Sequence, residues 1–266
     1  MSEDLSYGRY LRVPELLELQ RPRSRPPHPE ELHFIIVHQA AELWMKLMLH
    51  DLERVIAALD ASAWPQALGL LGRTSHVMSH VLDQMRTLHT LPPWALEEFR
   101  SYLGTASGSQ SQQFRELELL SGLRDPAYRK ALEAEYGQDL PAALAARLAQ
   151  RSLAEAHLDA GRRLGLDGIR QWADLYVAPG DRGAFYLICE ALVDYDERWT
   201  RWRAEHVALV ERALGDHARG TGGMALNYLR RTTRLRFFPV LWALRDELVV
   251  RGGGELVDRP SPRGAG

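Results

Sequence analysis

Cysteine is nearly absent from the sequence, which holds only Cys189 in 266 residues. A single thiol excludes an internal disulfide, and it excludes zinc cages and iron–sulfur clusters that are built from several thiolates. This scarcity is typical of the reducing cytoplasm, where we expect the chain to reside. Lysine is also scarce, with only Lys46 and Lys130, and we attach no function to the preference for arginine.

Excess charge and long apolar runs are missing as well. The 33 basic and 35 acidic residues give a formal net charge of -2, so no general field attracts nucleic acid or an anionic membrane surface. The most apolar stretch is interrupted by His38, Glu42 and Lys46, and the N-terminal MSEDLSYGRY lacks a basic region followed by an apolar run. We therefore expect no nucleic-acid partner, no membrane span and no signal peptide.

Alternating strand patterns are absent too, whereas helical patterns cover most of the chain. Neither Pro nor Gly interrupts residues 30–60, and apolar side chains cover nearly every face, which predicts a long, centrally buried helix. Pro239 is expected to kink the last helix. Further helices are predicted over about 64–89, 111–120, 181–215 and 224–250, with several short ones over 126–175. The predicted fold class is all-α.

The two ends of the chain differ from this core. At the N-terminus a short amphipathic piece at 11–20 is followed by the proline- and arginine-rich linker 21–29. Residues 252–266 have no apolar periodicity, which predicts a disordered tail. The apolar content of 45% is enough for one core, so we expect a single domain over 1–251.

Two histidines lie inside apolar helical stripes. His38 follows Phe34 by one helical turn, so the two rings share a face. His206 follows Trp199 and Trp202 in another apolar helix. Taken singly, each is more often a satisfied core histidine than a ligand. As a pair in two buried helices, they favour the arrangement of a proximal and a distal imidazole around a haem iron.

Other constellations carry less weight. His76 and His80 stand four residues apart, but no nearby Glu completes a metalloprotease signature. A carboxylate-bridged di-iron bundle needs two Glu-x-x-His pairs, and only Glu30 with His33 is present. GTGG at 220–223 has neither a preceding strand nor a following Lys, so it is more often a turn than a phosphate loop.

Five ordered segments resemble the tryptophan 2,3-dioxygenase family. In chain order, the first two are LSYGRYLRVPELLELQ at 5–20 and HPEELHFIIVHQAAELWMKLMLHDL at 28–52. The others are FRSYLGTASGSQSQQFRELE at 99–118, RWRAEHVALVERALG at 201–215, and GTGG followed by YLRRTTRLRFFPVLW at 228–242. Any one would be weak, but their order over residues 5 to about 245 is specific. The resemblance implies a long-helix bundle that encloses a pocket for haem b.

The resemblance also implies roles for individual residues. His206 matches the axial haem ligand, and His38 matches the distal histidine that hydrogen-bonds the indole N–H. Arg100 matches the arginine that binds the substrate carboxylate, a task that suits its planar fork. The other matching positions line the pocket or contact the amino-acid end of the substrate: Phe34, Leu103, Ser107, Gly108 and Thr221.

Tyr7 and Tyr10 match tyrosines that a neighbouring subunit lends to the pocket. The resemblance therefore implies a homotetramer in which residues 1–29 are exchanged between subunits. Read without the family pattern, these tyrosines could be a surface staple, Phe34 a core residue, and Arg100 a solvated side chain.

The implied activity is the haem-dependent cleavage of the indole C2–C3 bond of L-tryptophan, or a close derivative, by O₂ to N-formylkynurenine, as in tryptophan catabolism by the kynurenine pathway. Leu96 stands where the family has Tyr or Phe, and Met224 follows GTGG where the family continues with Ser. These departures motivate one alternative, a haem monooxygenase of a modified tryptophan in a biosynthetic pathway. A non-catalytic haem sensor is the other, although a sensor has no need of a carboxylate-binding Arg100.

Overall fold

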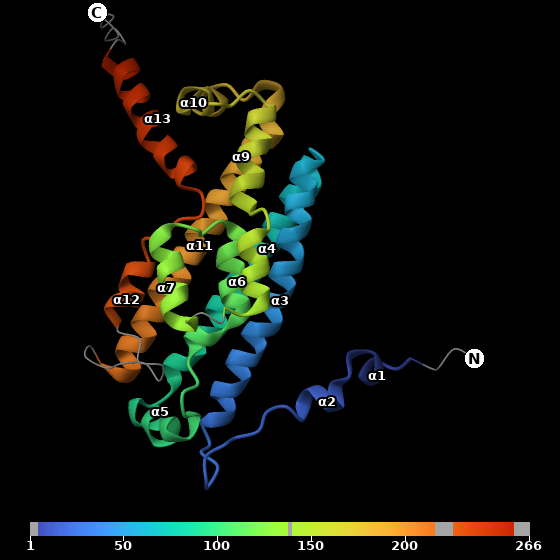
Figure 1. Cartoon of the computed structure of the whole chain (residues 1–266), viewed down its shortest axis with the longest axis vertical. Helices are drawn as coiled ribbons and strands as arrows, with labels where there is room; N and C mark the ends of the chain where they lie inside the picture. The colour runs from blue at the N-terminus through green and yellow to red at the C-terminus, as the bar shows by residue number, and fades with distance from the viewer. Residues whose placement is uncertain (1–4, 138–139, 216–225, 258–266) are drawn as a thin grey trace, which may run out of the picture. The chain divides into compact units, whose positions relative to one another are not determined.

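The computed structural model describes residues 5–137, 140–215 and 226–257, and within these ranges the chain forms α- and 3-10 helices without a strand. Its longest elements are α3 (Glu31–Asp60), α4 (Trp64–Arg86) and α11 (Gly183–Leu214), seen in Figure 1. Their bounds lie within a few residues of the predicted ones. The all-α prediction is confirmed.

The chain divides into two compact units, and three of the five divisions fall inside the long helices α3, α4 and α11. Unit 1 comprises Met1–Trp44, His80–Ser111 and Trp202–Thr233. Unit 2 comprises Met45–Ser79, Gln112–Arg201 and Arg234–Gly266. The single domain over 1–251 stays a prediction.

Unit 1 contains the first part of α3 and the last part of α11, together with short elements. Val37, Met85 and Leu88 form its buried core, and Phe34 and Trp202 are among the partly buried side chains packed against it. Its short elements are α1 (Tyr7–Leu11), α2 (Val13–Leu17), α5 (Pro93–Arg100), α12 (Leu226–Thr232) and the 3-10 turns Thr87–Thr90, Ser101–Leu103 and Gly108–Gln110.

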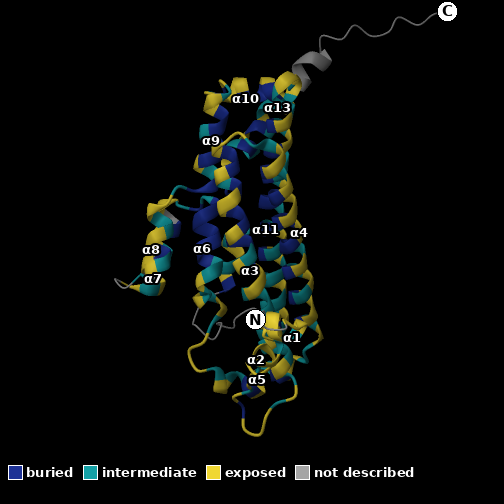
Figure 2. Cartoon of the chain, turned by 90° about the vertical axis from the view of Figure 1, so that its right-hand side faces the viewer, coloured by how far each residue is buried: buried dark blue, intermediate teal, exposed yellow. Residues whose placement is uncertain are grey.

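Unit 2 surrounds an aromatic core in which Trp199 packs edge-on against Phe237, with ring centroids 5.4 Å apart. The helix α6 is buried from Arg115 to Ser121, as Figure 2 shows, and it packs against α8, while α10 packs against α13. The elements of this unit are α6 (Gln112–Ser121), α7 (Pro126–Tyr136), α8 (Ala142–Ala149), α9 (Leu153–Arg163), α10 (Ile169–Val177), the 3-10 turn Gly180–Arg182 and α13 (Pro239–Val257).

The helix α3 is less buried than its sequence indicated. Met48, Leu52 and Leu59 are fully buried, but Leu43 is 56% exposed and Ile36 is 47% exposed. The prediction of a centrally buried helix is therefore wrong for its outer face. Because apolar side chains on this face contact no other part of the described chain closely enough to exclude water, they are available to a partner.

Two proline-containing segments also differ from expectation. The helix predicted over 224–250 is instead α12 and α13, separated by residues 233–238, and Pro239 is the first residue of α13 rather than a kink. Pro93 likewise begins α5, a helix that was not predicted. Both cases follow from the same property: proline has no N–H to lose at a first helical position, and its φ is already helical.

The C-terminal helix runs further than predicted. The sequence placed the tail at 252–266, but α13 continues to Val257, and residues 258–266 lie outside the described part of the chain. Among the helices that the structure describes, none combines the length and the apolar character needed to cross a membrane.

Candidate active site

His38 lies on α3 with its ring fixed by Phe34. The Nδ1 atom of His38 is 2.7 Å from the carbonyl oxygen of Phe34, one turn earlier in the helix. Because a carbonyl oxygen only accepts, Nδ1 is the protonated, donating nitrogen, and Nε2 keeps its lone pair. The two rings also lie with centroids 4.2 Å apart. His38 therefore offers an oriented hydrogen-bond acceptor.

His206 lies on α11, stacked on Trp202 with ring centroids 5.1 Å apart and an interplanar angle of 19°. Burial, and secondarily the charge of nearby His38, lower the pKa of His206 to about 4. Burial also lowers the pKa of His38, against the raising effects of the Phe34 carbonyl and the Glu42 carboxylate. Both imidazoles are therefore neutral near pH 7, the form in which histidine binds a metal.

The helical faces that bear the two histidines pack together within unit 1. Phe34 and Val37 of α3 join Trp202 and Leu209 of α11 in one apolar cluster. Since His206 lies between Trp202 and Leu209 on the same side of its helix, this packing brings it toward His38. The roles of the two histidines as a proximal and a distal residue stay a prediction.

Surface exposure and depth disagree at His38, and the disagreement is informative. A large part of the residue's surface is open to solvent, yet enough protein surrounds the ring to lower its pKa. His38 is therefore accessible from solvent, while the protein around its ring disfavours the charged form.

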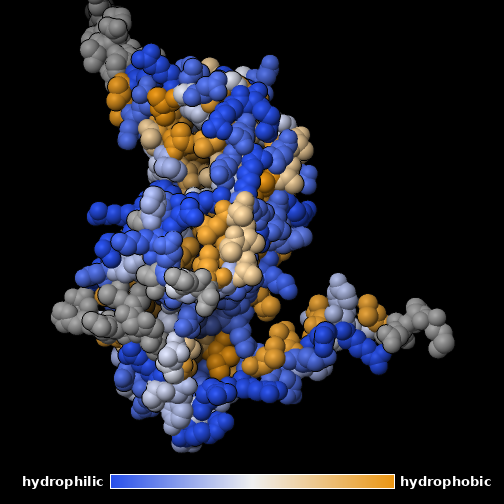
Figure 3. All heavy atoms as spheres, in the orientation of Figure 1, coloured by the Kyte–Doolittle hydropathy of each residue, from blue (hydrophilic) through white to orange (hydrophobic). Residues whose placement is uncertain are grey.

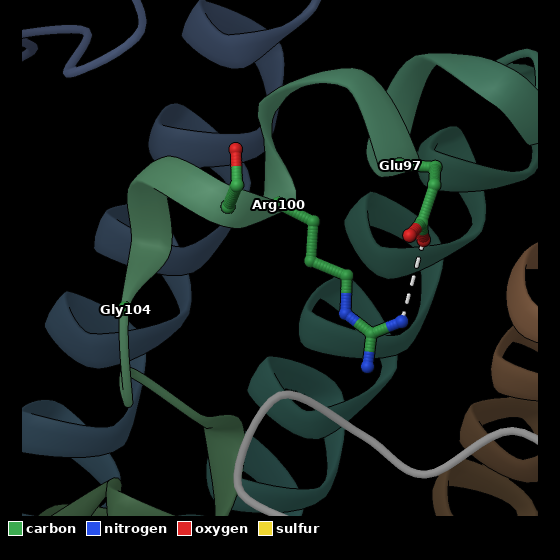
Figure 4. A pocket seen from close by; sticks show the side chains of 4 residues that line it. Glu97, Arg100 and Gly104 are labelled. Atoms are coloured by element: carbon green, nitrogen blue, oxygen red, sulfur yellow. Dashed lines mark hydrogen bonds and ion pairs between the residues drawn. The ribbon is translucent and has the colours of Figure 1, made fainter.

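Arg100 lies on the helix α5, which contacts α3 through Phe99. The fully buried Phe99 packs edge-on against Phe34, with centroids 5.6 Å apart, so α5 is anchored to the start of α3. The next residue, Arg100, lines a pocket of about 270 Å³ together with Glu97, Ser101 and Gly104. In Figure 4 the Arg100 guanidinium and the Glu97 carboxylate point toward each other, and Nη1 donates to Oε2 over 3.3 Å.

The segment 101–111 carries three more of the predicted residues: Leu103, Ser107 and Gly108. Ser111 fixes its far end by donating from Oγ to Oε1 of Glu42 over 2.6 Å. Tyr102 fixes its near end through a hydrogen bond from its hydroxyl to the carbonyl of Arg25, at 3.0 Å. The Ser107 hydroxyl caps the turn Gly108–Gln110 in a capping box, so in this conformation it serves the loop itself.

Three acidic residues near the site were missed by the sequence analysis. Glu42 follows His38 by one helical turn, a spacing that could have found it. Glu205 precedes His206 and accepts from His89 Nε2 at 2.9 Å and Arg86 Nη2 at 3.3 Å. Glu97 precedes Arg100 by one turn, but that signal exists only once α5 is known to be a helix.

Two predicted residues are not brought to the histidine pair, and a third is not described by the structure. Tyr7 and Tyr10 lie on α1, 77% and 69% exposed, and within the described residues their side chains make no hydrogen bond or ring contact. Thr221 lies outside the described part of the chain. The tyrosines' role in the pocket of a neighbouring subunit stays a prediction.

The described residues contain no group of three or more His, Cys, Asp or Glu side chains that could hold a metal ion by themselves. His80, one of the two histidines weighed as helical metal ligands, stacks on Trp44 with centroids 6.1 Å apart. A metal at this site would therefore depend on a ligand other than the chain, as a porphyrin provides.

These features define an all-α protein with a neutral histidine pair and an arginine-lined pocket in one unit. The family model described as tryptophan 2,3-dioxygenase matches residues 1–171 and 127–248. The chain belongs to the tryptophan 2,3-dioxygenase family.

Curated relatives agree over nearly the whole chain. A tryptophan 2,3-dioxygenase of a Nocardioides species is 41% identical over 258 residues, which cover 92% of this chain and 95% of the relative. The enzyme of the same name from Burkholderia pseudomallei is 37% identical, covering 93% and 86%. That of Bacillus thuringiensis subsp. konkukian is 34% identical, covering 92% and 94%.

Proposed function

We propose that this protein is a haem-dependent dioxygenase that cleaves the indole C2–C3 bond of L-tryptophan, or a close derivative, to N-formylkynurenine. The observation that carries the proposal is the placement of His38, His206 and Arg100 in one unit of a member of this family. The relatives' shared name gives the reaction, and the residues give the means of positioning a substrate. The enzyme would open the kynurenine pathway of tryptophan catabolism in the cytoplasm.

The donor set fits a haem b. His206 is neutral near pH 7, and neither of its ring nitrogens has a hydrogen-bond partner among the described residues. Stacking on Trp202 fixes the plane of the imidazole, so that His206 would hold the haem iron through an oriented ring nitrogen. When bound, the haem would supply the iron at which O₂ is activated.

The chain's own contribution is to position the indole. His38 would accept a hydrogen bond from the indole N–H at Nε2, because Nδ1 is committed to the Phe34 carbonyl. The Phe34 ring would form the wall of the pocket beside it. Arg100 would bind the substrate carboxylate through two parallel N–H donors. Holding both ends of the substrate converts binding energy into orientation, and small misplacements are costly.

The remaining predicted contacts complete the amino-acid end. Leu103, Ser107 and Gly108 lie on the anchored segment that follows Arg100, and Thr221 would contact the substrate ammonium group. Tyr7 and Tyr10 would reach a neighbouring subunit of a homotetramer, since the linker 21–29 gives their segment reach.

The monooxygenase alternative is not favoured. It rested on Leu96 and Met224, whereas the curated relatives in three different genera are named tryptophan 2,3-dioxygenase. The sensor alternative has no use for the Arg100 pocket, which lies on the helix anchored to Phe34.

Labelled oxygen tests the reaction. The haem-loaded protein is incubated with L-tryptophan, a reductant and ¹⁸O₂, and the product is examined by mass spectrometry. Incorporation of both labelled atoms is the expected result. A product that has gained a single labelled atom would establish monooxygenation instead, and haem-loaded protein that leaves tryptophan unchanged would refute an oxygenase.

A further inference from the structure

The pocket at α5 presents two opposite charges side by side. Glu97 and Arg100 both line it, and the Glu97 carboxylate accepts a hydrogen bond from the guanidinium over 3.3 Å. The Arg100 side chain is 24% exposed and the Glu97 side chain 71%, so the pair lies at the pocket surface with the acid outermost.

An α-amino acid carries the complementary pattern, a carboxylate and an ammonium group on the same carbon. We propose that Glu97 binds the substrate ammonium while Arg100 binds the carboxylate, so that this pair selects a zwitterionic amino acid. Glu97 thereby becomes a specificity-determining residue, in addition to Thr221. The inference rests on the proposed function, because it concerns the same substrate.

The ion pair between Glu97 and Arg100 is easily rearranged. Exposed pairs three residues apart contribute little to stability, because water screens them. A guanidinium has five N–H donors, which is enough for Glu97 and a substrate carboxylate at once. When the substrate carboxylate binds Arg100, the substrate ammonium then lies next to the Glu97 carboxylate.

Three anchors on one substrate distinguish its mirror images. The indole would lie at Phe34 and His38, the carboxylate at Arg100 and the ammonium at Glu97. Phe99 ties these positions together, since it precedes Arg100 and packs on Phe34. In D-tryptophan the ammonium and the hydrogen on the α-carbon exchange places, so two anchors can be satisfied but not the third.

Glu98 provides a matched control. It is the next residue of α5, and it is also acidic and exposed, but its Oε2 lies 3.0 Å from His28 Nε2 and not at the pocket. E97Q and E98Q therefore remove the same charge from the same helix, and only E97Q removes it from beside Arg100.

Ligand binding to the haem-loaded, full-length protein is measured by calorimetry. The ligands are L-tryptophan, D-tryptophan and indole-3-propionate, which lacks the ammonium. E97Q should weaken L-tryptophan binding about tenfold, leave indole-3-propionate unchanged and reduce the preference for the L isomer. E97D should retain more of that preference than E97Q, and E98Q should match wild type.

Two results would overturn the role of Glu97. Equal affinities of E97Q and wild type for all three ligands would show that the carboxylate does not contact the substrate. Tighter binding of both L-tryptophan and indole-3-propionate by E97Q would show that Glu97 merely competes for Arg100. Wild-type protein that binds no tryptophan would refute the proposed function itself, which separates that failure from failure at Glu97.

Discussion

The His206 ring is held by packing rather than by hydrogen bonds. Trp202 stacks on it, Leu209 follows one turn later in the same apolar cluster, and no described residue bonds its nitrogens. Burial keeps the imidazole neutral, with a pKa of about 4. His206 therefore presents an uncharged ring nitrogen that can bind a metal.

Replacing this donor should remove the cofactor. We expect H206A to lose the Soret band and bound iron, because the imidazole is the one protein ligand assigned to the haem. H76A removes an exposed histidine elsewhere and should keep both. Absorbance and iron analysis of the purified variants measure this, and an unchanged spectrum in H206A would mean that another residue ligates the iron.

A second buried histidine, His157, bears on stability. It is fully buried in unit 2, its Nε2 lies 3.4 Å from Cys189 Sγ, and its Nδ1 has no hydrogen-bond partner. Burial lowers its pKa to about 3. An unfolded histidine titrates near 6.5, so between about pH 6.5 and 3 the unfolded chain binds the extra proton.

Stability should therefore fall as the solution becomes acidic. The contribution of neutral His157 is complete above pH 6.5, and about 2 kcal/mol of unfolding free energy should be lost between pH 7 and pH 5. H157L cannot bind the proton, so its loss over that interval should be smaller by this amount. Urea unfolding at both pH values measures the difference, and parallel losses in the two proteins would contradict the assignment.

The segment that leads into α13 is held by a carboxylate that is distant in sequence. Asp196, buried on α11, accepts at Oδ2 from the backbone N–H groups of Phe237 and Phe238 at 3.1 and 3.3 Å. The same oxygen accepts from Trp242 Nε1 at 2.9 Å. Phe237 and Phe238 directly precede Pro239, so this side chain satisfies the buried donors of the segment that leads into the helix.

Removing that acceptor should destabilise unit 2. We expect D196A to lower the free energy of unfolding by about 2 to 4 kcal/mol, because it strands buried donors. D196N keeps one acceptor oxygen and should lose less. Chemical denaturation measures the stability of both variants and of the wild type. Equal stability of D196A and wild type would show that Asp196 does not stabilise this segment.

The same elements show what the sequence could and could not predict. The long helices have many turns of apolar periodicity, and their bounds were predicted closely. The break before Pro239 was missed because Asp196, which holds the segment that leads into α13, comes from another helix. His38 and His206 were found because they interrupt apolar stripes, whereas Glu97 was missed because its relation to Arg100 requires the helix α5.

The N-terminal arm, which comprises residues 5–20 with α1 and α2, is largely exposed. Its leucines Leu5, Leu17 and Leu19 are 68%, 69% and 58% exposed, and Figure 3 shows apolar side chains along it. Within unit 1 its last residues are tied to α3 by Gln39, whose Nε2 donates to the carbonyl of Leu19 at 3.1 Å. Exposed apolar side chains in such a segment fit the predicted exchange between subunits.

Deleting residues 1–20 should remove only the helical residues of α1 and α2 and leave the other helices intact, since no core residue is lost. It should also dissociate the predicted homotetramer and reduce activity. Light scattering and circular dichroism measure the two properties. The substitutions Y7A and Y10A, which keep the arm, should reduce activity with assembly intact. A truncated monomer with full activity would refute shared pockets.

The lone cysteine is a natural probe of local unfolding in unit 2. Cys189 is fully buried, burial raises the pKa of its thiol, and no second cysteine can react in its place. A thiol reagent should therefore leave the native protein unmodified and label one sulfur only when unit 2 opens around α11. The labelling rate then measures how often unit 2 unfolds locally around Cys189, without an engineered probe.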